Sequence, residues 1–124
     1  GAKGCILINE CTDPFSYEAV RASMGAIFNI NIISINSKEF IQWRKEALFT
    51  LIGTSLKNAE DYRKANWDSP FILLMGNEQK GLSDQLIAEC DQLIKIPMLG
   101  SSDSLNLAVS TGVALYESIR KNPI

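Results

Sequence analysis

The pattern that most limits the fold of this chain is a short apolar strand followed at once by a glycine-bounded turn. Residues 71–75 read Phe-Ile-Leu-Leu-Met, an unbroken apolar run that predicts a strand buried on both faces of a parallel sheet. The run stops at residues 76–81, Gly-Asn-Glu-Gln-Lys-Gly, where two glycines permit a tight turn and the close approach of a ligand. Ser83 or Asp84 is then a candidate cap for the helix that follows.

The same alternation of strand and helix runs along the whole chain. Apolar runs predict strands at residues 5–8, 30–35, 47–52, 71–75 and 93–96, and helical spacing predicts helices at 16–28 (capped by Ser16), after the cap Ser37, at 84–90 and at 104–121. Residues 62–65 are predicted to form either a short helix or an edge loop. This order predicts an α/β fold, a parallel sheet with helices on both faces. Ligands collect beyond the carboxyl ends of such strands, so the polar turns after Ile52, Met75 and Ile96 are expected to form one site.

The amino-acid composition limits the kinds of partner and site that this chain can have. At 124 residues the chain is expected to form one domain, and its net charge of −2 gives no overall electrostatic footprint for nucleic acid. A polyanionic partner would have to be held by a local patch or by another domain. The three cysteines have no CxxC spacing and there is no histidine, so we expect reduced cytosolic thiols, no metal site and no Ser-His or Cys-His pair. No apolar run is long enough to span a membrane and no signal peptide is visible, which favours a cytoplasmic protein.

The last predicted helix is apolar on two sides. Helical spacing places a core-facing stripe at Leu105, Ala108, Val109, Gly112, Val113, Tyr116 and Ile119. Leu107, Ala114 and Leu115 fall off this stripe and form a second apolar side. We expect part of the helix to face a second subunit, the alternative being cover by an upstream segment of the same protein.

The turns alone do not identify a ligand. Residues 76–81 match neither GxGxxG nor a Walker loop, and a plain turn is the simplest interpretation. Glu78 can orient a cation or a hydroxyl from within this turn, or simply face solvent. Asp103 is the expected cap of the last helix, which would leave Ser104 and Asn106 to point elsewhere; alternatively those two residues only cap the helix. On these grounds the chain is a ligand-binding α/β domain.

Taken in order, the motifs resemble those of the SpoU (TrmH-like) RNA methyltransferases of the SPOUT class. The residues that carry the resemblance are Gly76-Asn77-Glu78 with Gly81, Ile96-Pro97-Met98, Ser104-Leu105-Asn106, and upstream Asp13-Pro14-Phe15 with the run VRASMGA at 20–26. The resemblance covers essentially the whole chain. Each glycine motif is weak alone, whereas the ordered set at these spacings is highly specific.

The resemblance implies a fold with a deep trefoil knot at the carboxyl end, whose loops build a cofactor pocket. S-Adenosylmethionine would lie among the turns after Ile52, Met75 and Ile96. Its implied contacts are Thr54, Gly76, Asn77, Ile96, Met98, Ser104 and Leu105. The implied reaction is methyl transfer to a ribose 2′-hydroxyl of tRNA or rRNA, which requires deprotonation of the hydroxyl and in-line alignment with the methyl carbon.

The resemblance also implies roles for individual residues. Glu78, Ser104 and Asn106 match active-site positions, with Glu78 expected to hold an arginine and Asn106 to help position the substrate. Arg21 and Ser23 are expected to face RNA. The carboxyl-terminal helix and knot region are expected to form a homodimer.

One family motif is not matched. The family's first motif contains an asparagine and an arginine, usually assigned to activating the hydroxyl, and residues 1–4 resemble only its tail. The single domain of residues 1–124 is therefore expected to lack its first strand and first motif, so that the full-length protein is an enzyme and this fragment is inactive. The alternative is a noncatalytic cofactor-binding or dimerisation module of the same fold. A flavodoxin-like or Rossmann-type nucleotide binder ranks last, because residues 9–14 contain no glycine.

Overall fold

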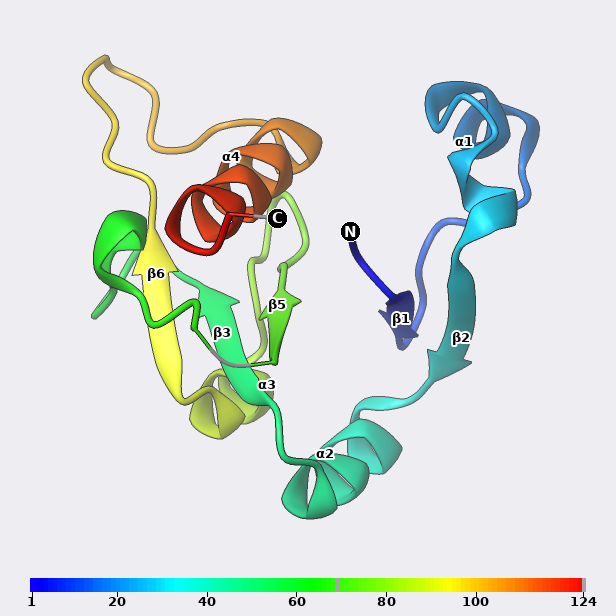
Figure 1. Ribbon diagram of the computed structural model, residues 1–124, viewed down its shortest axis with the longest axis horizontal. Helices are drawn as coiled ribbons and strands as arrows, with labels where there is room; N and C mark the ends of the chain where they lie inside the picture. The colour runs from blue at the N-terminus through cyan, green and yellow to red at the C-terminus, as the bar shows by residue number, and fades with distance from the viewer. Residues whose placement is uncertain (69, 124) are drawn as a thin grey trace. The chain divides into compact units, whose positions relative to one another are not determined.

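The chain divides into two compact units in the computed structural model, which describes residues 1–68 and 70–123. The units comprise residues 1–46 and 47–124, and each has its own sheet of parallel strands (Figure 1). The predicted α/β class with parallel pairing is thereby confirmed, although the strands are divided between two sheets where one was predicted. The single domain, helices on both sheet faces and the trefoil knot stay predictions.

The first unit is built on a two-stranded parallel ribbon. Its elements are β1 (Gly4–Ile8), α1 (Tyr17–Ala22), the 3₁₀ helix η1 (Ala26–Asn29), β2 (Asn31–Ile35) and α2 (Ser37–Glu46). β1 and β2 pair from Gly4 opposite Asn31 to Ile8 opposite Ile35. Asn9 joins the two strand ends, because its backbone N–H donates to Ile35 O at 2.9 Å and its Oδ1 accepts from Ser37 N at 2.9 Å.

The predicted helix at residues 16–28 is shorter than expected. Ser16 caps α1 as predicted, its Oγ accepting from Ala19 N at 3.2 Å, but the helix ends at Ala22. Met24 and Gly25 take left-handed φ values of 52° and 79°, which a helix cannot continue through. Met24, placed on the inner face by helical spacing, is consequently 93% exposed.

The cap of α2 is Asn36, one residue before the Ser37 predicted from the sequence. Asn36 Oδ1 accepts from Glu39 N at 2.8 Å, and Glu39 Oε2 accepts in return from Asn36 N at 3.2 Å. This reciprocal pair is a capping box, in which two backbone donors at the helix start are satisfied together. It fixes the first turn from which Phe40, the fully buried residue of α2, extends.

The second unit carries the four-stranded parallel sheet. Its elements are β3 (Thr50–Thr54), β4 (Glu60–Asp61), the 3₁₀ helix η2 (Tyr62–Lys64), β5 (Phe71–Leu74), α3 (Asp84–Glu89), β6 (Gln92–Lys95) and α4 (Leu107–Lys121). The strands lie in the order β4-β6-β3-β5. β3 is thus central and has Leu51 and Ile52 at 0% exposure, whereas β5, predicted to be buried on both faces, lies at an edge. No helix of the described residues is long and apolar enough to cross a membrane.

The core of this unit gathers around Trp67. The indole is 2% exposed, packs with Ile52, Ile94 and Ala114, and meets Phe71 edge-on at 5.1 Å between ring centroids. Its Nε1–H donates to Tyr62 O at 3.1 Å, so the one polar atom of the ring is satisfied inside the core. Ala114 therefore packs α4 against strands β3 and β6.

The face of α4 that meets the core is the opposite of the predicted one. The buried residues are Ala114, Glu117 and Ser118, whereas Val109 and Tyr116 of the predicted core stripe are 52% and 74% exposed. A polar side can be buried here because its groups are satisfied locally: Ser118 Oγ donates to Leu115 O at 2.6 Å. Small side chains also let the helix approach the sheet closely, a factor that hydrophobic spacing does not register.

Candidate functional site

Three polar turns meet at one edge of the four-stranded sheet. β3 lies between β5 and β6, all three run parallel, and their carboxyl ends therefore face the same way. Thr54 ends β3, where its Oγ1 donates to Leu74 O at 3.5 Å, and so joins the ends of β3 and β5. This topology puts the carboxyl ends of β3, β5 and β6 at one edge, and the expectation that their turns form one site stays a prediction.

The turn after β5 holds itself closed. Asn77 and Gly81 exchange two backbone hydrogen bonds, from Asn77 N to Gly81 O at 3.2 Å and from Gly81 N to Asn77 O at 2.8 Å. Asn77 Oδ1 accepts from Gln79 N at 2.9 Å and Lys80 N at 3.1 Å. The Asn77 side-chain oxygen is therefore used to build the turn, and Gly81 closes it in the left-handed region with φ 67°.

Gly76 has no room for a side chain. A Cβ at this position would lie 2.4 Å from Gly81 C and 2.5 Å from Leu82 N, both backbone atoms that cannot move without opening the turn. Gly53 on β3 is similarly tight, since its Cβ would lie 2.5 Å from Cys90 Sγ. The space beside Gly76 is thus filled by the backbone of residues 81 and 82, and the close approach of a ligand at this turn stays a prediction.

A hollow of about 520 Å³ opens beside the segment that follows β6. It is lined by Leu56, Lys95, Ile96, Pro97, Met98, Gly100, Ser102 and Asp103. Its volume lies in the range of small-molecule sites. Ile96 and Met98, two of the expected cofactor contacts, line it together.

The start of α4 differs from the prediction. Asn106 caps the helix, its Oδ1 accepting from Ala108 N at 2.9 Å and from Val109 N at 3.3 Å, so the assignment of Asp103 as the cap is wrong. A cap must lie directly before the first helical residue, and that residue is Leu107. Ser104 and Leu105 precede the cap and are exposed.

The remaining predicted residues are spread over the two units. Glu78 is exposed, and no described contact joins it to Ser104 or Asn106. Arg21 and Ser23 belong to the first unit, at the end of α1, where Ser23 Oγ donates to Val20 O at 2.9 Å and Arg21 is exposed. Among the described residues no cluster of His, Cys, Asp and Glu has the arrangement of a metal site.

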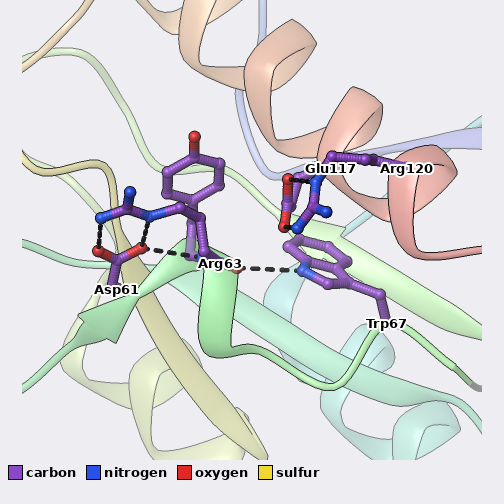
Figure 2. A network of polar contacts seen from close by, with 6 residues as sticks. Asp61, Arg63, Trp67, Glu117 and Arg120 are labelled. Carbon is purple, nitrogen blue, oxygen red and sulfur yellow. Dashed lines mark hydrogen bonds and ion pairs between the residues drawn. The ribbon is translucent and has the colours of Figure 1, made fainter.

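A polar network near Trp67 was not anticipated from the sequence (Figure 2). Arg120 Nε and Nη2 donate to Glu117 at 2.8 and 2.7 Å, and Arg63 makes the same two-point contact with Asp61. Each guanidinium holds the pKa of its partner carboxyl below the usual range, through hydrogen bonds first and charge second. The sequence offered only the close spacing of these pairs as a signal.

Known proteins with the same pattern are RNA methyltransferases. The model of the SpoU rRNA Methylase family matches residues 1–116. A 23S rRNA (uridine(2479)-2′-O)-methyltransferase of Streptomyces viridochromogenes is 34% identical over 98% of this chain and 44% of its own length. A protein of Bacillus subtilis classed with the TrmH family tRNA/rRNA methyltransferases is 33% identical over 100% of the chain and 51% of its own length.

Solved structures that resemble this chain are also methyltransferases. The AdoMet-bound rRNA methyltransferase of Sinorhizobium meliloti superposes with a TM-score of 0.94 at 48% identity, covering 98% of this chain and 47% of that one. The SpoU methyltransferase AviRb of Streptomyces viridochromogenes, in complex with AdoMet, has a TM-score of 0.86 at 32% identity over 98% of this chain and 48% of its own. The chain spans about half the length of the relatives it matches. With the family model matching nearly its whole length, this chain belongs to the SpoU rRNA methylase family.

Proposed function

We propose that this protein is a methyltransferase that transfers a methyl group from S-adenosylmethionine to a ribose 2′-hydroxyl of tRNA or rRNA. The observation that carries the proposal is the sheet edge where the turns after β3, β5 and β6 meet, in a fold superposing at a TM-score of 0.94 on an AdoMet-bound enzyme. In the reaction the methyl carbon leaves sulfur and bonds to the ribose oxygen, which loses its proton.

The cofactor is proposed to lie across the ends of these strands. Gly76 is a proposed contact from the closed turn after β5, and the hollow beside Ile96 and Met98 has the size for a nucleoside. The further proposed contacts are Thr54, Asn77, Ser104 and Leu105. Asn77 contributes through its amide nitrogen and the second lone pair of its backbone carbonyl, since its backbone N–H and its Oδ1 are already hydrogen bonded within the turn.

Catalysis is proposed to involve Glu78, Ser104 and Asn106. Glu78 has a solvent-facing carboxylate that can pair with a cationic side chain, and the family resemblance assigns that arginine to a motif outside these residues. Asn106 Oδ1 is committed to the helix cap, so substrate contact would use its Nδ2 donors. We therefore propose that residues 1–124 alone bind cofactor without turnover, and that exposed Arg21, with Ser23 beside it, contacts RNA.

A homodimer through α4 is the proposed assembly. Val109 and Tyr116 are 52% and 74% exposed and lie two turns apart on one side of the helix, and Leu105, just before the helix cap, is 36% exposed. An apolar helix side of this kind gains stability when it is covered by a second copy. Sedimentation of the chain beside its Val109→Asp variant tests this, because a charge at the centre of the interface would shift a dimer to monomer.

Calorimetric titration with S-adenosylmethionine tests the cofactor proposal. We expect saturable binding that Gly76→Ala abolishes and that Lys38→Gln, an exposed position on α2, leaves unchanged. A folded chain that binds no cofactor would contradict the proposed pocket. Cofactor binding without methylation of RNA by the full-length protein would instead favour the noncatalytic module of the same fold.

A further inference from the structure

A group of cations lies where η2 meets the carboxyl end of α4. Arg63 and Lys64 end η2, and Arg120 and Lys121 end α4; all four side chains are exposed. The two elements contact each other, and the pKa of the Glu117 carboxyl is lowered by its hydrogen bonds from Arg120 and then by the charges of Arg120, Lys121 and Arg63. Lys64 follows Arg63 in η2. We call these four residues the basic patch.

The acidic partners of the two arginines are turned inward. The side chains of Arg63 and Arg120 are 60% and 67% exposed, whereas those of Asp61 and Glu117 are only 19% and 7% exposed. Figure 2 shows the carboxylate of Glu117 close to the Trp67 indole and the Asp61–Arg63 pair at the other end of the network. The outer surface of the patch therefore presents guanidinium groups over shielded carboxylates.

The hydrogen bonds fix which edge of each guanidinium remains available. Both arginines use Nε and one Nη2 hydrogen on their carboxylate. A guanidinium has five N–H donors, so three remain on each, and within residues 1–68 and 70–123 no acceptor receives a hydrogen bond from either Nη1. The carboxylates hold the planar groups in one orientation, which lowers the entropy lost when a second planar acceptor binds.

Two further features give the patch the character of a nucleic-acid surface. Arg63 Cζ lies 5.9 Å from the centroid of the Tyr62 ring, so an aromatic face is part of the same surface. Asp61 lies opposite Lys95 in the pairing of β4 with β6, and Lys95 lines the hollow with Ile96 and Met98. Arg63 of the patch is thus bonded to the residue that lies opposite Lys95 beside the hollow.

We propose that the basic patch binds the phosphate backbone of the substrate RNA and leads it toward the hollow after β6. This inference rests on the proposed function, because it takes RNA as the substrate. Phosphate suits the geometry, since a planar guanidinium edge donates two parallel hydrogen bonds to two phosphate oxygens. A chain with a net charge of −2 needs such a local patch to hold a polyanion, and here the four cations outnumber the two carboxylates that pair with the arginines.

The test is fluorescence anisotropy of a labelled single-stranded RNA with the chain, over a series of salt concentrations. Lys64→Gln/Lys121→Gln removes two charges without touching a buried carboxylate, and Arg63→Lys/Arg120→Lys keeps the charge but removes the second guanidinium edge. Lys38→Gln/Lys45→Gln on α2 is the matched control, because it removes two exposed charges outside the patch. Thermal melting of every variant confirms folding, and cofactor calorimetry on the same samples tests the proposed function separately.

The two patch variants are expected to change RNA binding in different ways. The lysine pair should lower the slope of log affinity against log salt by about 1.4, roughly 0.7 for each phosphate that is no longer neutralised on a single strand. The Arg-to-Lys pair should weaken binding at every salt concentration with the slope unchanged, and the α2 control should match the parent chain. If the patch variants bind RNA as the control does while cofactor binding persists, the inference is overturned and the proposed function is not. Poly-glutamate that binds as tightly as RNA would also overturn the inference, because it would point to an acidic protein segment as the partner.

Discussion

Glu117 and Arg120 form a two-point ion pair one turn apart on α4, with the carboxylate buried beside the core and the guanidinium at the surface. The pair allows an acidic residue to occupy the core-facing side of the helix, because both carboxylate oxygens accept a hydrogen bond there. Asp61 at the end of β4 and Arg63 on η2 form a similar pair, which gives the same unit a second shielded carboxylate.

Stability of the second unit should therefore fall in acid. The pKa values of Asp61 and Glu117 are lowered from their ordinary 3.8 and 4.5 when the chain folds, so the unfolded chain takes up protons first as the pH falls. The stabilisation is fully present above about pH 5 and is lost as the pH falls through the lower folded values. Urea midpoints measured from pH 7 to about pH 3 should be level and then decline. Glu117→Gln should decline less steeply, and an unchanged profile in that variant would contradict the assignment.

The two glycines of the turn after β5 should respond differently to substitution. Gly81→Ala meets no neighbouring atom but must hold φ 67°, at a cost of about 1–2 kcal/mol, and Gly81→Asn should recover most of that loss because asparagine tolerates the left-handed region. Gly76→Ala and Gly76→Asn should both fail to bind cofactor, since any Cβ meets the backbone of residues 81 and 82. Calorimetry measures cofactor binding and chemical denaturation measures stability in all four variants. Together they separate the backbone strain expected at residue 81 from the steric overlap expected at residue 76. Cofactor binding by Gly76→Asn would show that the turn can open at little cost.

Replacement of Asn106 should test its role as the cap of α4 separately from its proposed role in positioning the substrate. Asn106→Ala removes the cap of α4 and should cost about 1 kcal/mol, whereas Asn106→Asp keeps an acceptor and should restore most of that stability. Asp103→Ala is the control and should change stability by less than about 0.5 kcal/mol, because residue 103 does not cap the helix. If the proposed function holds and Nδ2 of Asn106 positions the substrate, Asn106→Asp should methylate RNA slowly despite its restored melting temperature. Full activity in that variant would limit Asn106 to capping.

The indole of Trp67 should be the largest single contributor to the core of the second unit. Trp67→Ala should destabilise by about 3–5 kcal/mol, because the side chain is 2% exposed and its loss leaves a cavity against Ile52 and Ile94. Tyr17→Ala, an aromatic truncation at a residue 75% exposed, should cost far less. Equilibrium unfolding followed by circular dichroism measures both. Similar losses in the two variants would show that burial does not determine their contributions.

Strand and helix positions followed from the sequence wherever apolar runs were separated by turns. β1, β2, β5, α3 and β6 lie within one or two residues of their predicted bounds, because glycine, proline or capping residues limit each of them. β3 begins at Thr50, three residues later than its apolar run. α1 ends early because Met24 and Gly25 adopt left-handed φ values, which hydrophobic spacing cannot reveal.

The part of the candidate site that lies at strand ends could be predicted from the sequence. Adjacent parallel strands end at Thr54 or just before Gly76, Ile96 and Met98, so topology alone brings these four residues to one edge. The roles of Glu78, Ser104 and Asn106 came from the family resemblance and stay predictions. The basic patch was missed because it depends on a contact between η2 and α4, which no local pattern in either segment encodes.

The strand order β4-β6-β3-β5 also has a consequence for how the chain folds during synthesis. β6, the last of these strands to be made, pairs with β3 and β4, and Leu51 N donates to Asp91 Oδ2 across 40 residues of sequence. β3 cannot gain its second neighbour, nor β4 any neighbour, until β6 has left the ribosome. Nascent chains ending before β6 would carry exposed strand edges, so late, non-local pairing makes this unit slow to fold and dependent on the last of its strands.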